Sequence, residues 1–177
     1  MMNVFLLMLR AVFASIITFC FIVVAPAYAE QSRSPIEDGI SYLGNNSYEE
    51  AIRAFTHQLE INPSDEYAYN LRGVSKAKRG DFDGAIDDYN QSLQIDQHQI
   101  ETYGNRGIAK ARSGDLSGSI ADFDAALLLD PLNAESYFNH AMSMDMVGNL
   151  EQACSDWFKA MEYGDERSER FLSKNCG

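Results

Sequence analysis

The sequence predicts an all-α protein, a solenoid of stacked helical hairpins, from three observations. First, residues 66–133 hold one unit written twice, because a shift of 34 residues superposes twelve identical positions. Second, small and apolar residues recur at a spacing of four within each copy, which places them on one helical face. Third, each copy contains a Gly-Asp pair near its middle, Gly80-Asp81 in the first and Gly114-Asp115 in the second. Glycine commonly ends a helix and aspartate commonly begins one, so each copy should consist of two helices. A period of this length is typical of a stacked array.

The repeated unit resembles the tetratricopeptide repeat (TPR). That family has aromatic residues at positions 4 and 24, small residues at positions 8, 20 and 27, and proline at position 32. The first complete copy supplies Tyr69, Gly73, Ala85, Tyr89 and Ser92. The second supplies Tyr103, Gly107, Ser119, Phe123, Ala126 and Pro131. The resemblance implies a right-handed superhelical solenoid; Gln97, in place of proline, is its main departure.

The same register continues on both sides and predicts about four repeats. The resulting organisation is a signal peptide at 1–29, an N-terminal tail at 30–34, a divergent first repeat at 35–65, repeats at 66–99, 100–133 and 134–164, and a capping helix with a tail at 165–177. Polar residues precede each second helix, namely Ser47, Asp81, Asp115 and Asn149. They predict N-caps, with a capping box expected at Ser47 and at Asn149.

Residues 1–29 are typical of an export signal. Arg10 precedes an apolar run, and Ala27-Tyr28-Ala29 before Glu30 is an A-x-A cleavage site. Cleavage would direct the chain to the periplasm or cell envelope of a bacterium. The alternative is an uncleaved membrane anchor, which distinguishes a free scaffold from an anchored subunit of an envelope complex. Met8 is a second candidate for the start codon, beside Met1.

Composition excludes some partners. The chain carries 26 acidic and 14 basic residues, a net charge of −12. Such a surface repels nucleic acid and anionic membranes. The charge either keeps the array soluble or attracts a basic partner, and composition leaves both readings open.

No group of residues has the spacing of a catalytic or metal site. His57, His98 and His140 stand at unrelated repeat positions without ligand spacing, and acidic pairs such as Asp87-Asp88 are typical of a hydrated helix face. We therefore expect no enzyme activity, cofactor, metal or small-molecule substrate. A recurring Arg–Asp pair, Arg72 with Asp88 and Arg106 with Asp122, predicts a surface ion pair between helices. In the last repeat, His140 stands opposite Asp156 instead.

The resemblance also implies where a partner binds. TPR proteins hold an extended peptide or a partner's helix in a concave groove lined by the first helix of each repeat. The corresponding residues are Tyr67, Asn70, Val74, Lys78, Asn105, Ile108, Arg112, Phe138, Asn139, Met142 and Met146. The cations with which some members clamp the C-termini of chaperones are absent, since those positions hold Ile36, Ile40, Leu71, Glu101 and Asn105. We expect a scaffold that binds a protein or peptide other than a chaperone C-terminus.

Two cysteines remain once the signal containing Cys20 has been removed, Cys154 and Cys176. Both lie a similar number of residues from Gly164, where the chain reverses between two antiparallel helices. They should therefore meet at one end of this hairpin, and an oxidising compartment would let them form a disulfide. The alternative is a buried Cys154 beside a free terminal thiol.

Overall fold

The computed structural model describes residues 33–177. The chain divides into two units, 1–34 and Pro35–Gly177, and every helix described here belongs to the second. The expected signal peptide lies outside the described residues, as does most of the tail at 30–34.

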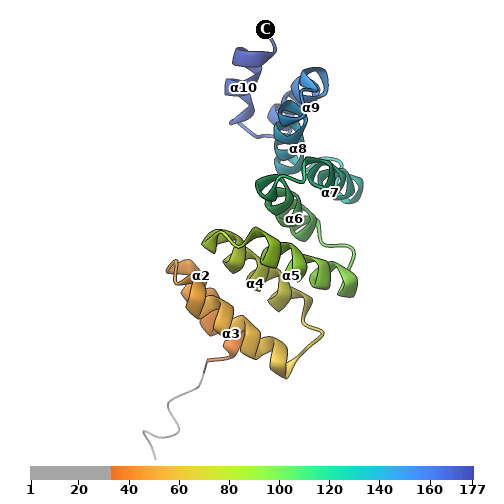
Figure 1. The fold of residues 1–177 in the computed structure, drawn as a ribbon. Coiled ribbons are helices and arrows are strands. Elements are labelled where there is room, and N and C mark those ends of the chain that lie inside the picture. The colour runs from red at the N-terminus through yellow and green to blue at the C-terminus, as the bar shows by residue number, and fades with distance from the viewer. Residues whose placement is uncertain (1–32) are drawn as a thin grey trace, which may run out of the picture. The chain divides into compact units, whose positions relative to one another are not determined.

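Residues 33–177 form nine α-helices and no strand, so the all-α class is confirmed (Figure 1). The helices are α2 (Pro35–Gly44), α3 (Tyr48–Ile61), α4 (Glu66–Arg79), α5 (Phe82–Ile95), α6 (Ile100–Ser113), α7 (Leu116–Leu129), α8 (Ala134–Met146), α9 (Leu150–Glu162) and α10 (Ser168–Asn175). Over this range, no helix combines the length and apolarity needed to cross a bilayer.

Each helix packs against the next, and the first helices of neighbouring hairpins also touch: α2 with α4, α4 with α6, and α6 with α8. The structure is therefore a solenoid, with the first helices forming one continuous wall. Helices α4, α6, α8 and α10 begin at Glu66, Ile100, Ala134 and Ser168, which are 34 residues apart. The capping helix α10 is thus the first helix of a fifth repeat that has no second helix.

Within each hairpin, a small residue of the first helix faces an aromatic ring of the second. The rings of Tyr89 and Phe123 are each 1% exposed. A Cβ atom added to Gly73 would lie 2.7 Å from Cε1 of Tyr89, and one added to Gly107 would lie 2.9 Å from Cε1 of Phe123. Glycine is required at both positions because the ring occupies the space of a side chain.

The turns between paired helices follow the expected chemistry, with one exception. Gly80 has φ 98°, and Asn46 takes the same left-handed region with φ 59° in the first repeat. The carboxylate of Asp81 accepts a hydrogen bond from the Gly84 backbone N–H. Ser47 precedes α3 but its hydroxyl makes no capping bond, so the capping box expected there is wrong. Its backbone φ and ψ of −85° and 69° resemble those of Asp81, which does cap.

The box expected at Asn149 forms only in part. The side chain of Asn149 accepts from the Gln152 N–H at 3.3 Å. The Gln152 amide does not return to Asn149, because it donates to the carboxylate of Asp156 at 3.0 and 3.1 Å. The backbone N–H of Asn149, which the Gln152 oxygen would have to accept from, donates instead to the Met144 carbonyl at 2.9 Å.

Candidate functional site

The wall formed by α4, α6 and α8 contains three hollows that meet at Ile108. This side chain is 37% exposed and lines all three. Val74, Ile108 and Met142 occupy the same position in three successive repeats, and each lines at least one hollow. The period of the sequence therefore places an apolar row along the centre of the wall.

The hollow between α4 and α6 has a volume of about 460 Å³. Its lining includes Tyr89 and Ala109, both buried, together with the exposed cations Lys78 and Arg112. Burial, and then the charge of the neighbouring Asp88, raise the pKa of the Tyr89 hydroxyl well above its usual value. This hydroxyl is therefore a neutral group at physiological pH, and the only charged side chains in the lining of this hollow are Lys78 and Arg112.

Two hollows lie between α6 and α8. The larger, of about 410 Å³, is mainly apolar and is lined by Phe138, Met142 and Met146 on α8 and by Arg112 on α6. Methionine side chains adapt to apolar groups of different shape. This hollow can therefore accept a large apolar side chain.

The smaller hollow, of about 240 Å³, lies at the other end of the same two helices. Glu101 and Glu135 supply its charge, and Asn105 and Asn139 supply two amides. Gly104 lies between them, and a Cβ atom added there would meet nothing within 4 Å. A ligand backbone can therefore approach α6 closely at this point.

Several polar side chains of the wall lack a partner. Within residues 33–177, the amides of Asn105 and Asn139 make no hydrogen bond, and Lys78 and Arg112 make no ion pair. An asparagine amide both donates and accepts, so it can pair with the N–H and C=O of an extended chain. These groups leave the wall with unused binding capacity.

Nine of the eleven residues expected to contact a partner line these hollows: Val74, Lys78, Asn105, Ile108, Arg112, Phe138, Asn139, Met142 and Met146. Tyr67 is 52% exposed and lines none of them. Asn70 differs from expectation, because it is 8% exposed and its Nδ2 donates to Oγ1 of Thr102 in the next repeat. Its hydrogen-bonding capacity is used inside the array.

Asn70 belongs to a buried polar cluster that sequence reasoning missed. Thr102 Oγ1 donates to Gln99 Oε1 at 2.9 Å, and Ser92 Oγ contacts the same oxygen at 3.1 Å. Gln99 Nε2 donates to the backbone oxygen of Asp96 at 2.9 Å. Gln99 thus fixes the loop in which Gln97 replaces the usual proline. The only indication of this cluster in the sequence was Gln99 itself, a polar side chain two residues after Gln97.

Phe138 has a structural role besides lining the groove. It is 9% exposed, its ring contacts Phe171 of α10 edge-on at 5.5 Å, and the guanidinium of Arg167 lies over it at 4.2 Å. A substitution here would disturb the cap together with the groove. Met142 is therefore the better residue with which to probe this hollow.

The recurring Arg–Asp pairs hold the first helices in place, and the expectation of a surface pair is wrong. The side chains of Asp88 and Asp122 are each only 4% exposed. Arg72 binds both carboxylate oxygens of Asp88 and also donates to Thr56 of the preceding repeat at 3.2 Å. Lysines at the next turn, Lys76 and Lys110, bind the same carboxylates at 2.8 and 2.9 Å. Their recurrence with the period was the available signal.

His140 takes the place of arginine in the fourth repeat. Its Nδ1 lies 2.7 Å from Oδ2 of Asp156, and its Nε2 lies 3.4 Å from Oδ1 of Asp124 on α7. His140 thus joins its own repeat to the preceding one, as Arg72 and Arg106 do in their repeats. Its role is structural, since its side chain is only 6% exposed.

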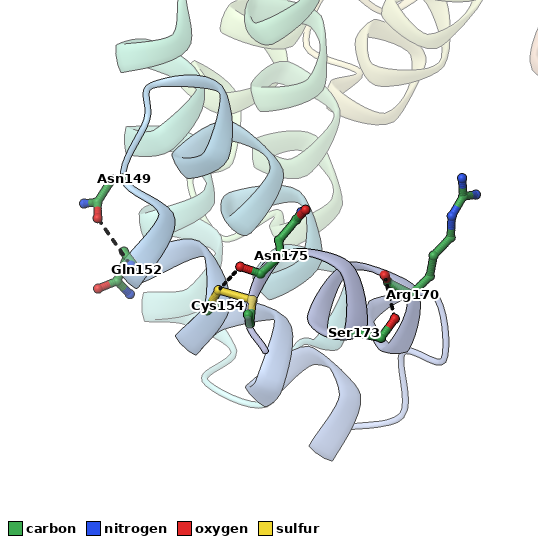
Figure 2. The surroundings of a disulfide bond; sticks show 7 residues. Asn149, Gln152, Cys154, Arg170, Ser173 and Asn175 are labelled. Carbon is green, nitrogen blue, oxygen red and sulfur yellow. Dashed lines mark hydrogen bonds between the residues drawn. A yellow bond between two sulfur atoms is a disulfide. The ribbon is translucent and has the colours of Figure 1, made fainter.

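A disulfide between Cys154 and Cys176 holds α10 against α9, with Cα atoms 5.7 Å apart (Figure 2). Phe171 of α10 stacks on Trp157 at 5.0 Å, while Glu169, Arg170 and Lys174 face solvent. The cap therefore covers the last apolar surface with a polar exterior. In the part of the chain from Arg33 onward, no cluster of histidine, cysteine and carboxylate side chains could hold a metal ion.

Comparisons with known proteins agree with this geometry. Residues 37–100 match the tetratricopeptide repeat family model. A crystal structure of MamA superposes with a TM-score of 0.68 at 20% identity, covering 71% of this chain and 74% of that one. The first TPR of Spaghetti (RPAP3), bound to the HSP90 peptide SRMEEVD, superposes with a TM-score of 0.63 at 22% identity, covering 64% and 90%. No curated protein sequence matches the chain significantly.

Residues 37–100 therefore match the tetratricopeptide repeat model, and the helices of Pro35–Gly177 share the fold of these solved structures.

Proposed function

We propose that this protein is a non-enzymatic scaffold of the bacterial cell envelope that binds an extended peptide or a partner helix in its groove. The observation that carries the proposal is the meeting of three hollows at Ile108, on a wall with unpaired amides and cations. A groove of this kind offers apolar anchoring sites and hydrogen bonds to a backbone. The peptide-bound RPAP3 structure supports the same use of this fold.

The bound segment differs from a chaperone C-terminus. At the positions where such TPR domains hold a terminal carboxylate, this chain has Ile36, Ile40, Leu71, Glu101 and Asn105. Four of these side chains are neutral and one is negative, so they would not hold a carboxylate.

Export is the second part of the proposal. The apolar run with its A-x-A site before Glu30 supports it, and the Cys154–Cys176 bridge suits an oxidising compartment. Mass spectrometry of the protein from its own host tests it. A mature N-terminus at Glu30 means a free periplasmic scaffold, whereas an intact N-terminus means the alternative, a membrane-anchored subunit of an envelope complex.

Site-specific crosslinking tests the groove. A photoreactive amino acid at Ile108 should link the natural partner in the host, and the same group at Gln91, exposed on the second helix α5, should not. Crosslinks from Gln91 alone would place the interface on the opposite face. In binding assays, Asn105→Ala and Met142→Ala should each weaken binding of the partner by about 1–2 kcal/mol without changing the helix content of the protein.

A further inference from the structure

We propose that the groove binds an extended protein segment carrying a basic, an apolar and an acidic side chain in order across the wall. This inference rests on the proposed function and specifies the partner of the same site. It depends on how charge is distributed over the three hollows around Ile108.

The hollow near the N-terminal ends of α6 and α8 is built for a basic side chain. Glu101 and Glu135 both line it, and its lining contains no cation. Arg167 interacts electrostatically with Glu135 from outside the lining, whereas Glu101 makes no ion pair within residues 33–177. A lysine or arginine side chain placed here could also donate hydrogen bonds to the amide oxygens of Asn105 and Asn139.

The opposite side of the wall has the reverse charge. Lys78 and Arg112 occupy the same position in successive repeats, and the two larger hollows contain no carboxylate in their lining. Other cations of the array, such as Arg72 and Lys110, are bound to aspartates. In a protein with a net charge of −12, a pair of unpaired cations beside an apolar hollow favours a carboxylate from the ligand.

The apolar centre lies between these two charged ends. Ile108 and Met142 belong to the central row, and Met146 adds apolar surface toward Arg112. From Glu101 to Arg112 the helix α6 rises by roughly 16 Å, at about 1.5 Å per residue. An extended chain covers that distance in about five residues. The basic and acidic side chains should therefore stand four to six residues apart, at about 3.3 Å per residue, with the apolar one between them.

The backbone of the ligand favours the extended form. Asn105 and Asn139 present unpaired amides one repeat apart, and Gly104 leaves open space beside them. An extended chain has free N–H and C=O groups to meet these amides, whereas a helix has used its own. A helical ligand would need about eleven residues to cover the same distance.

Selection from a displayed library of random peptides of about twelve residues tests the proposal, with the protein purified from its own host as the target. The selected peptides should share the basic–apolar–acidic order at the predicted spacing. The double variant Lys78→Glu, Arg112→Glu should weaken them at least about tenfold and should select peptides whose acidic end has become basic. The double variant Glu101→Lys, Glu135→Lys should invert the other end in the same way. Asp83→Lys with Asp87→Lys, two exposed residues of α5, controls for the rise in net charge of this second double variant.

The outcomes separate this inference from the proposed function. One outcome is that selected peptides fail to bind the Ile108→Asp variant yet show another charge order, or a spacing of about eleven residues. That result would overturn the inference about the ligand and still support binding in the groove. Peptides indifferent to Ile108→Asp, or no enrichment at all, would count against the groove itself. Amidating the peptide C-terminus should change nothing, because we assign the carboxylate to a side chain; a loss of binding would contradict that assignment.

Discussion

The guanidinium of Arg106 binds the carboxylate of Asp122 along one edge, with Nε donating to Oδ2 at 2.9 Å and Nη2 donating to Oδ1 at 2.6 Å. The remaining nitrogen, Nη1, donates to Asn90 of the preceding repeat at 2.8 Å. One side chain thus joins both helices of its own repeat and the repeat before it. Because Arg106 lies on α6, this contact also fixes the helix that carries Asn105, Ile108 and Arg112 of the groove.

Arg106→Ala should destabilise the array by about 2 kcal/mol, because it leaves a buried carboxylate with Lys110 as its remaining cation. Urea unfolding followed by circular dichroism measures the loss. Arg53→Ala is the matched control, since Arg53 pairs with Glu50 on the surface, where the two side chains are 69% and 45% exposed. That control should cost less than about 0.5 kcal/mol. Equal losses from the two variants would mean that the periodic pair contributes no more than a surface pair.

Gly107→Ala should lower stability by about 1–3 kcal/mol, because the added Cβ would lie 2.9 Å from two atoms of the Phe123 ring. The same substitution at Gly104, three residues earlier on α6, meets nothing within 4 Å. Gly104→Ala should therefore raise stability by up to about 1 kcal/mol through helix propensity alone. Thermal melting of both variants gives the comparison, and a shift in the same direction for both would refute the close packing at Gly107.

Gly118→Leu, at first sight a natural comparison for Gly107, is a poor control. A Cβ atom at Gly118 would lie 2.1 Å from Oδ2 of Asp115, whose carboxylate caps α7. The spacing of residues indicates that Gly118 follows a turn, but it does not say which glycine faces open space. Only the position of the cap in three dimensions distinguishes Gly104 from Gly118.

The fold was predictable because one period sets both the helix positions and the contacts between helices. Gly73 opposite Tyr89 follows from the repeat pattern alone. The cluster of Asn70, Thr102 and Gln99 was not predictable, because its three residues occur together at one junction and do not recur. The burial of Asp88 and Asp122 was also missed: acidic residues are usually exposed, and only the structure reveals two cations on each carboxylate.

The candidate site was predictable as a surface but less so residue by residue. Position in the repeat places Val74, Ile108 and Met142 on one wall, and they line the hollows there. It could not reveal that Phe138 packs under Phe171, because that contact depends on α10, which continues the register with only half a repeat. At the end of the array, the packing of a residue is determined more by its contacts with the capping helix than by its position in the repeat.

Tyr89 should make the protein sensitive to alkaline pH. Its folded-state pKa is raised above the ordinary value of 10.0 by burial, so the folded state keeps a proton that the unfolded chain releases. Stability should therefore be unaffected below pH 10 and should fall as the pH rises above it, by at most about 1.4 kcal/mol per pH unit for one proton. Melting temperatures between pH 8 and pH 11 measure the trend.

Tyr89→Phe removes the proton while it keeps the ring and should flatten that alkaline decline. Tyr67→Phe is the control, because it removes the same hydroxyl from a tyrosine that is 52% exposed. The variant at Tyr67 should decline with pH as the original protein does. If Tyr89→Phe declined just as steeply, the alkaline loss would arise from other groups.

Reducing the Cys154–Cys176 bridge should release α10 and leave the hollow between α4 and α6 intact. The bond closes a loop with a sequence separation of 22, for which the chain-entropy model suggests about 3 kcal/mol. The loss should be local, because repeats contact only their neighbours and α10 packs chiefly on α9. Hydrogen exchange on the double variant Cys154→Ser, Cys176→Ser should therefore show faster exchange in Ser168–Asn175 and at Trp157, with α4 and α5 unchanged. A second measurement is alkylation of the unsubstituted protein after unfolding, which counts its free thiols. Two reactive thiols, or uniform exchange throughout the array after the substitution, would contradict a bridge that pins only the cap.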